Sequence, residues 1–119
     1  MSGFTPVPAS AMTWERNVLG SEVTRLRTDG AMLTIVHGRK GDIVPPHGYT
    51  KGSVTYVVSG LIEIDGTVMG PGDAGTYKAP AGYFSVKFLE DSTYVVARAD
   101  ADEITVGDIG ERAAHNLDA

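Results

Sequence analysis

Two side chains near the middle of the sequence, His47 and Tyr49, have the types and spacing for acid–base chemistry. An imidazole titrates near neutral pH and can take or give a proton, and a phenol can donate one. Residues two apart on an extended strand face the same side of it. If this stretch is a strand, the pair predicts a general base, His47, and a general acid, Tyr49, facing one cavity. The alternatives are a hydrogen-bonded pocket histidine and a tyrosine ring that only fills space.

Six further side chains are candidates for binding a ligand beside this pair. Hydroxyl side chains can orient a ligand by hydrogen bonds, although they also line barrel interiors with bound water. Lys87 could offer a positive charge to an anionic ligand, or it could extend into solvent. His37 ends an apolar strand, where it could reach the mouth of the pocket or serve as a structural histidine. The ligand-binding candidates are Ser53, Thr55, Ser85, Tyr83, Lys87 and His37.

The elements that must position these residues are predicted to be strands. Apolar and polar residues alternate between turn signals spaced about ten residues apart, which indicates an all-β sandwich or barrel. Asp65 and Gly66 form a two-residue hairpin signal. Residues 43–49 contain two consecutive prolines, which lack the N–H that a central ladder needs, so this stretch is expected at an edge or in a bulge. The other predicted strands cover 21–27, 31–37, 53–59, 61–65, 67–69, 75–79, 84–89 and 93–100.

The two ends of the chain lack the strand pattern. Residues 1–20 carry a Thr-Pro-Val-Pro segment that favours extended backbone, and we expect an N-terminal arm there. Trp14 is expected to anchor this arm on the barrel or on a partner subunit. Residues 101–119 are expected to form a C-terminal tail with a short helix, because Asp108 and a glutamate three residues later resemble a capping box. The barrel itself is expected over residues 21–100.

The segment from Gly41 to Gly60 resembles the first sequence motif of the cupin superfamily. That motif contains a glycine, two histidines, a glutamate and a closing glycine. His47 has the separation from Gly41 that the first histidine of the motif has. Tyr49 stands at the second histidine position and Ser53 at the glutamate position. The Tyr-Val-Val-Ser-Gly ending of the segment is typical of cupins.

A second segment, from Gly72 to Gly82, is similar to the second cupin motif with larger departures. Seven residues rather than five separate Gly72 from Pro80, and Ser85 falls on the position of the last histidine. The resemblance covers about residues 30–98. It implies an RmlC-like cupin barrel, an antiparallel double-stranded β-helix or jelly roll, whose inward side chains converge on a small-molecule pocket.

The resemblance also bears on metal binding. Metal-bearing cupins typically use three histidines and one glutamate, and of these four this sequence keeps His47 alone. A divalent ion would then depend on one imidazole and neutral oxygens, whereas several protein ligands normally hold such an ion. We therefore expect no bound metal and no other cofactor.

The composition of the chain indicates which classes of partner it is expected to bind. The net charge of −5 disfavours nucleic acid. The apolar runs are too short for a membrane-spanning helix, and the first residues lack the pattern of a secretory signal. The absence of cysteine fits a cytoplasmic location. Apolar residues Val54, Tyr56 and Val58 are expected on the outside of the barrel, where they would need a cover, so we expect a homodimer.

Three functions remain open at this point. The first is a metal-independent isomerase, epimerase or lyase that acts on a small organic acid or sugar through His47 and Tyr49, a chemistry similar to that of metal-independent sugar epimerases among the cupins. The second is a non-catalytic ligand-binding or sensor cupin, which would need no proton transfer. The third is a metal-dependent, dioxygenase-like cupin with an unusual ligand set that recruits His37.

Overall fold

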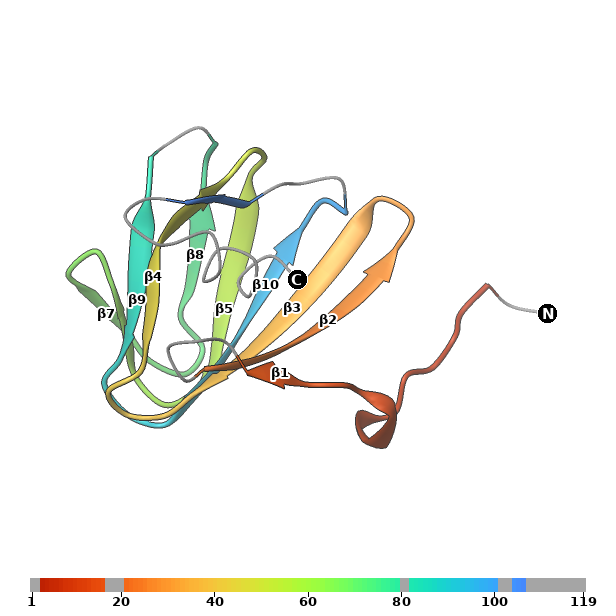
Figure 1. The fold of residues 1–119 in the computed structure, drawn as a ribbon, viewed down its shortest axis with the longest axis horizontal. Helices are drawn as coiled ribbons and strands as arrows, with labels where there is room; N and C mark the ends of the chain where they lie inside the picture. Colours follow the sequence, from red (N-terminus) through yellow and green to blue (C-terminus); the bar gives the residue numbers. More distant parts are fainter. Residues whose placement is uncertain (1–2, 17–20, 80–81, 101–103, 107–119) are drawn as a thin grey trace.

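Two antiparallel sheets face each other in the computed structural model, which describes residues 3–16, 21–79, 82–100 and 104–106 (Figure 1). One sheet has the strand order β1-β2-β3-β10-β5-β8. Its strands are β1 (Glu15–Arg16), β2 (Glu22–Thr28), β3 (Ala31–Gly38), β10 (Ser92–Arg98), β5 (Ser53–Ser59) and β8 (Ala74–Tyr77). The all-β barrel expected from the sequence is therefore confirmed.

The second sheet has the strand order β11-β4-β9-β6-β7. Its strands are β11 (Ile104–Val106), β4 (Ile43–Tyr49), β9 (Phe84–Phe88), β6 (Ile62–Ile64) and β7 (Thr67–Met69). Strand β11 falls within the predicted tail and pairs with β4. The helix predicted from Asp108 lies outside the described residues. Among those that are described, no helix is long and apolar enough to cross a membrane.

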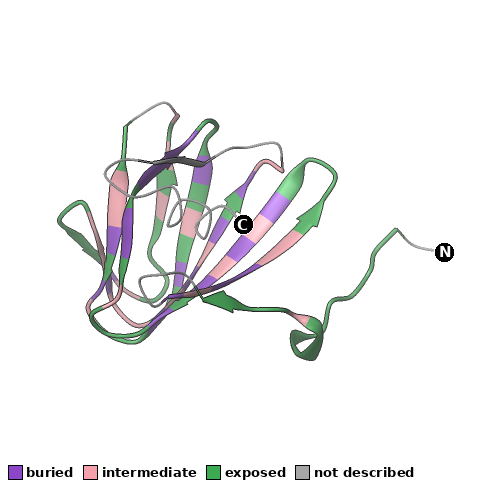
Figure 2. Ribbon diagram, in the orientation of Figure 1, coloured by how far each residue is buried: buried purple, intermediate pink, exposed green. Residues whose placement is uncertain are grey.

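The apolar core fills one end of the space between the sheets. Val57, Ile62, Val86 and Phe88 are almost fully buried there, and Figure 2 shows the buried segments on strands of both sheets. The remaining buried members of the core are Val23, Val36, Val44, Met69, Tyr94 and Val96. Because side chains alternate along each strand, the same strands that build this core carry further inward residues at their other ends.

Strand β4 contains an irregularity at its two prolines. Val44 pairs with Val86, but the next pair along the ladder joins His47 to Phe84. Three steps on β4 thus match two on β9, which is the geometry of a bulge with one extra residue. The extra residue shifts the alternation, so that His47 faces the interior as Val44 does. The predicted bulge is confirmed, and it is what aims the histidine inward.

The N-terminal arm is held at its base and extends away from the barrel (Figure 1). Strand β1 pairs with β2, and Ala9–Ala11 forms a short 3-10 turn further out. The Trp14 ring stacks on the His37 ring with centroids 4.1 Å apart. Trp14 therefore contacts its own barrel, which is one of the two positions expected from the sequence.

Candidate functional site

His47 is buried in the barrel with both ring nitrogens engaged. The Nδ1–H donates to the carbonyl oxygen of Pro45 at 2.8 Å, since a carbonyl can only accept. This bond fixes the tautomer of a neutral ring, so Nε2 keeps its lone pair. The hydroxyl of Tyr49 donates to Nε2 at 3.3 Å. The structure thus brings together the two residues that the sequence nominated as base and acid, with their polar atoms in contact.

An aromatic cluster surrounds this pair. The Phe84 ring lies 4.5 Å from the His47 ring, and the Tyr77 ring meets the Tyr49 ring edge-on at 5.7 Å. Tyr77 and Phe84 also contact each other, with centroids 5.4 Å apart. The four rings come from β4, β8 and β9 and therefore join the two sheets. The histidine is consequently shielded from bulk water, with 4% of its surface exposed.

The positively charged side chain of Arg98 lies next to Tyr49. The guanidinium carbon of Arg98 lies 4.5 Å from the centre of the Tyr49 ring, a cation–π contact. Burial lowers the pKa of His47 below its ordinary value of 6.5; the hydrogen bond to Pro45 opposes this effect, and the charge of Arg98 adds to it. His47 is therefore neutral at neutral pH, which leaves Nε2 able to accept a proton.

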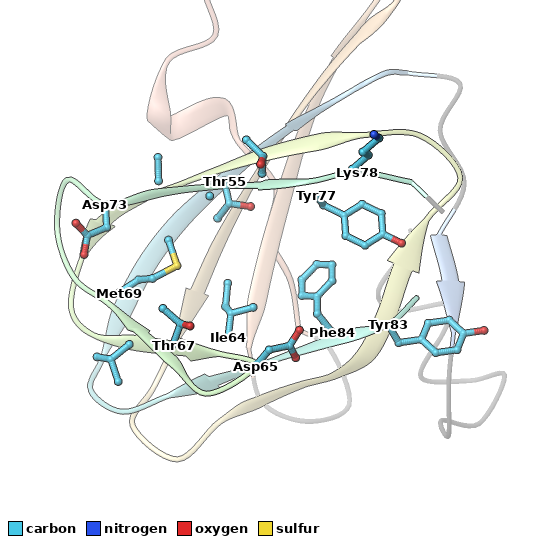
Figure 3. A pocket seen from close by; sticks show the side chains of 14 residues that line it. Thr55, Ile64, Asp65, Thr67, Met69, Asp73, Tyr77, Lys78, Tyr83 and Phe84 are labelled. Atoms are coloured by element: carbon cyan, nitrogen blue, oxygen red, sulfur yellow. The ribbon is translucent and has the colours of Figure 1, made fainter. Parts of the chain in front are cut away.

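A cleft of about 550 Å³ opens between β8 of one sheet and the β6–β7 hairpin of the other (Figure 3). Its walls include Ile64, Met69 and Gly75, and its inner end is formed by Tyr77 and Phe84. These two rings also touch Tyr49, so they stand between the cleft and the His47–Tyr49 pair. The volume lies in the range of pockets for small organic ligands.

The remaining candidates from the sequence fall in different places. Thr55 and the exposed Tyr83 line the cleft. Ser53 is buried on the inward face of β5, opposite Arg98 in the neighbouring strand, but does not line the cleft.

Ser85 and Lys87 do not face the interior, contrary to the sequence-based expectation. On β9 the inward residues are Phe84, Val86 and Phe88, so the residues between them point outward. The motif spacing had placed a ligand position at Ser85, one residue away from the inward Phe84. A slip of one residue along a strand moves a side chain to the opposite face.

His37 is also not at the cleft. It lies on the outer face of β3, under Trp14, and lines a separate hollow of about 270 Å³ with Glu22 and Asp91. The reason is again strand alternation, because the inward residues of β3 are Val36 and its even-numbered neighbours.

Three residues of the site escaped the sequence analysis: Arg98, Tyr77 and Phe84. Arg98 had a detectable signal, since it follows Tyr94 and Val96 at the same alternating positions of β10. A charged residue in the apolar phase of a strand indicates an interior charge. Tyr77 and Phe84 had no comparable signal, because aromatic residues occur on either face of a strand.

The side chains around His47 do not fit the metal site that metal-bearing cupins typically have. Within the described ranges, no group of three or more histidine and carboxylate side chains is placed to hold a metal ion. The rings beside His47 are those of Phe84 and Tyr49, and the nearby charge of Arg98 is positive and would repel a divalent cation.

Comparison with known proteins identifies the fold. No protein-family profile matches the sequence, and no curated protein does. Solved structures do match. An RmlC-like cupin from Shewanella frigidimarina is 19% identical, with a TM-score of 0.70 over 85% of this chain and 93% of that one.

Two further structures carry activities in their names. A sugar phosphate isomerase of the cupin superfamily from Silicibacter pomeroyi is 13% identical, with a TM-score of 0.73 over 88% of this chain and 83% of that one. An acetylacetone dioxygenase from Acinetobacter johnsonii is 11% identical, with a TM-score of 0.70 over 97% of this chain and 89% of that one. The chain therefore has the cupin fold, in the RmlC-like form.

Proposed function

We propose that this chain binds a small organic molecule in the cleft and moves a proton on it without a metal, as an isomerase, epimerase or lyase. The observation that carries the proposal is the buried, tautomer-fixed hydrogen bond between His47 Nε2 and the Tyr49 hydroxyl. General acid–base catalysis needs a neutral base and a proton donor within reach of one substrate. Both are present, but Tyr77 and Phe84 separate them from the cleft, so the proposal requires these two rings to move aside when a substrate binds.

The geometry supports one sequence of steps. A substrate oxygen takes the hydrogen bond of the Tyr49 hydroxyl, which frees His47 Nε2. Nε2 removes a proton from the carbon next to the substrate carbonyl, and Tyr49 protonates the carbonyl oxygen. The positive charge of Arg98 stabilises the negative charge that develops on that oxygen. The hydrogen bond between His47 and Tyr49 then returns the proton and resets the pair.

The fold comparison supports this reading at a coarser level. The similar structures include proteins named as a sugar phosphate isomerase and a dioxygenase, both of which act on small molecules. Because these proteins share under 25% identity with the chain, the likeness supports a small-molecule site and leaves the reaction to the residues. The residues around His47 favour the metal-independent alternative over the dioxygenase-like one.

The test is exchange of substrate C–H for deuterium in heavy water, followed by NMR over a panel of keto acids, hydroxy acids and ketose sugars. We expect His47→Gln and Tyr49→Phe each to lower the exchange rate by about 100-fold or more. Ser85→Ala is the matched control, because Ser85 faces outward, and it should exchange at the wild-type rate. Exchange that is unchanged in both site variants would exclude this pair as the catalyst.

A non-catalytic ligand-binding or sensor function is the second candidate. It is favoured by the burial of His47 and Tyr49 behind Tyr77 and Phe84, since a ligand can occupy the cleft without touching them. Under this reading a panel compound binds without any exchange, and His47→Gln leaves its dissociation constant unchanged.

We also propose that the chain is a homodimer. Val54, Tyr56 and Val58 lie on the outer face of β5 and are 53%, 49% and 50% exposed. Contiguous exposed apolar surface on a sheet usually marks an interface. The absence of cysteine residues supports placing this dimer in the cytoplasm.

A further inference from the structure

The charged side chains along the cleft are mostly negative. Among the described residues that line it, the acidic ones are Asp65, between β6 and β7, and Asp73, just before β8. The basic one is Lys78, which is exposed, so that its long side chain can extend into water. The whole chain also carries a net charge of −5. Local and overall charge therefore favour a cation in the cleft over an anion.

Asp65 carries a charge that its place in the turn does not require. Its φ of 49° makes it the one described residue other than glycine with a positive φ. The hairpin explains this conformation, since aspartate or asparagine followed by glycine is the preferred pair in such a turn. Asparagine would serve the turn equally well, without the charge. Within the described part of the chain, no hydrogen bond or ion pair holds the Asp65 carboxylate, which leaves it available to a ligand.

The strand ladder brings Asp65 close to a pair of aromatic rings. Ile64 pairs with Val86 of β9, so Asp65 and Phe84 both follow the same end of this ladder. Both side chains line the cleft (Figure 3). The Phe84 and Tyr77 rings lie 5.4 Å apart and are inclined by 46°, so they form two angled walls. The face of an aromatic ring attracts a cation, and a nearby carboxylate adds to that attraction.

The rest of the cleft indicates an organic cation rather than a metal ion. Ile64, Val68 and Met69 give the facing hairpin an apolar surface. The volume of about 550 Å³ has room for a ligand of several carbon atoms. In the part of the chain that the structure describes, no group of three or more histidine and carboxylate side chains could hold a metal ion.

We propose that the cleft binds a small organic cation, a primary amine with an apolar body, and that Asp65 selects for its charge. The ammonium group lies between the Asp65 carboxylate and the rings of Tyr77 and Phe84, and the apolar body lies along the β6–β7 hairpin. The cation stays on the cleft side of the two rings, so its binding requires neither their movement nor a proton transfer by His47. The proposal rests only on the ligand-binding part of the proposed function.

Three compounds are matched probes of the charge preference: 2-phenylethylamine, 2-phenylethanol and phenylacetate. They share a ring and differ in charge. NMR titration of the wild-type protein should show the amine binding about 3- to 10-fold more tightly than the alcohol, and phenylacetate binding more weakly than either. Raising the salt concentration from about 0.02 M to about 0.5 M should remove most of the advantage of the amine. Phenylacetate binding as tightly as the amine, or no binding of the amine, would overturn the proposal.

Asp65→Asn tests the residue itself, because asparagine keeps the turn and removes the charge. This variant should bind the amine about 3- to 10-fold more weakly and the alcohol as wild type does. Asp29→Asn is the matched control, since Asp29 precedes Gly30 in the β2–β3 hairpin and does not line the cleft. It removes the same overall charge and should change neither dissociation constant. Equal effects of the two variants would overturn the role of Asp65.

Thermal unfolding shows whether Asp65→Asn keeps its fold. Its melting temperature should lie within about 2 °C of the wild-type value. If it falls further, the salt dependence of the wild-type protein decides the question, because that measurement needs no variant. An amine affinity that does not fall with salt would overturn the proposal.

His47→Gln distinguishes this proposal from the proton-transfer function. The variant should bind the amine as wild type does, because His47 does not line the cleft. Loss of amine binding would place the ligand behind the two rings and overturn the cation site. Amine binding without deuterium exchange on any panel compound supports the cation site and counts against proton transfer. Exchange that depends on His47, without binding of the amine, overturns the cation site and leaves the proposed function intact.

Discussion

At the scale of single residues, the site depends on how one imidazole is held. The carbonyl of Pro45 takes the Nδ1–H of His47, and the Tyr49 hydroxyl takes the remaining lone pair. Burial then keeps the ring neutral, because a charge at this position would lose its hydration. The ring is thus held neutral, as the proposed general base would have to be, and this effect should be visible in the stability of the protein.

The first prediction at this scale concerns pH. Because the pKa of His47 is below 6.5 in the folded state, the unfolded chain binds the proton more readily between the folded value and 6.5. The free energy of unfolding should therefore fall as the pH drops through this range, and the stabilisation should be fully present above it. Urea unfolding from about pH 8 to about pH 5 should show a larger loss for wild type than for His47→Gln. Parallel curves for the two proteins would contradict a lowered pKa.

The sequence alone could not predict which way every candidate side chain points. The types and spacing of His47 and Tyr49 were sufficient to nominate the pair. Whether a side chain points into the barrel or out of it depends on how its strand aligns with the neighbouring strand. One extra residue in β4 turns His47 inward, and a one-residue error in β9 exchanges Ser85 for Phe84. Composition does not reveal such shifts, because they are set by how two strands align in space.

At the scale of elements, most strands followed from the alternation of apolar residues and from turn residues. The prediction for 53–59 matches β5, and the Asp65-Gly66 hairpin joins β6 to β7. Strand β11 was missed, since it has three residues and forms by pairing with β4. Short edge strands owe their conformation to a neighbour rather than to their own sequence.

The corner between β5 and β6 gives an element-scale prediction. Gly60 has a φ of 87°, and a Cβ there would overlap Ser92 Oγ and the carbonyl oxygen of Asp91. Gly60→Ala should lower the free energy of unfolding by about 2–4 kcal/mol, from left-handed strain and overpacking together. Gly66→Ala is the control, because Gly66 has a φ of 83° and no described atom within 4 Å. It should lose only about 1–2 kcal/mol in chemical denaturation. Equal losses would show that the corner is not tightly packed.

At the scale of the whole molecule, core and site share the same strands. Strand β10 carries Tyr94 and Val96 in the core and Arg98 beside the site, and β4 carries Val44 in the core and His47 in the site. A rigid apolar end therefore fixes the positions of the polar groups at the other end, as precise functional sites require. The outer face of the larger sheet takes no part in either, and its apolar residues need another explanation.

The proposed homodimer would explain these exposed apolar residues, and it gives the last prediction. In a twofold dimer the same patch meets itself, so Val54, Tyr56 and Val58 would all be covered by one contact. Sedimentation velocity at micromolar concentration should show a dimer for wild type and a monomer for Tyr56→Lys, because a lysine at the centre of this face would be buried without a partner. Val68→Lys is the matched control, since Val68 is also 53% exposed but lies on β7 of the other sheet, and it should leave the dimer intact. A wild-type monomer, or equal effects of both lysines, would contradict an interface on the β5 face.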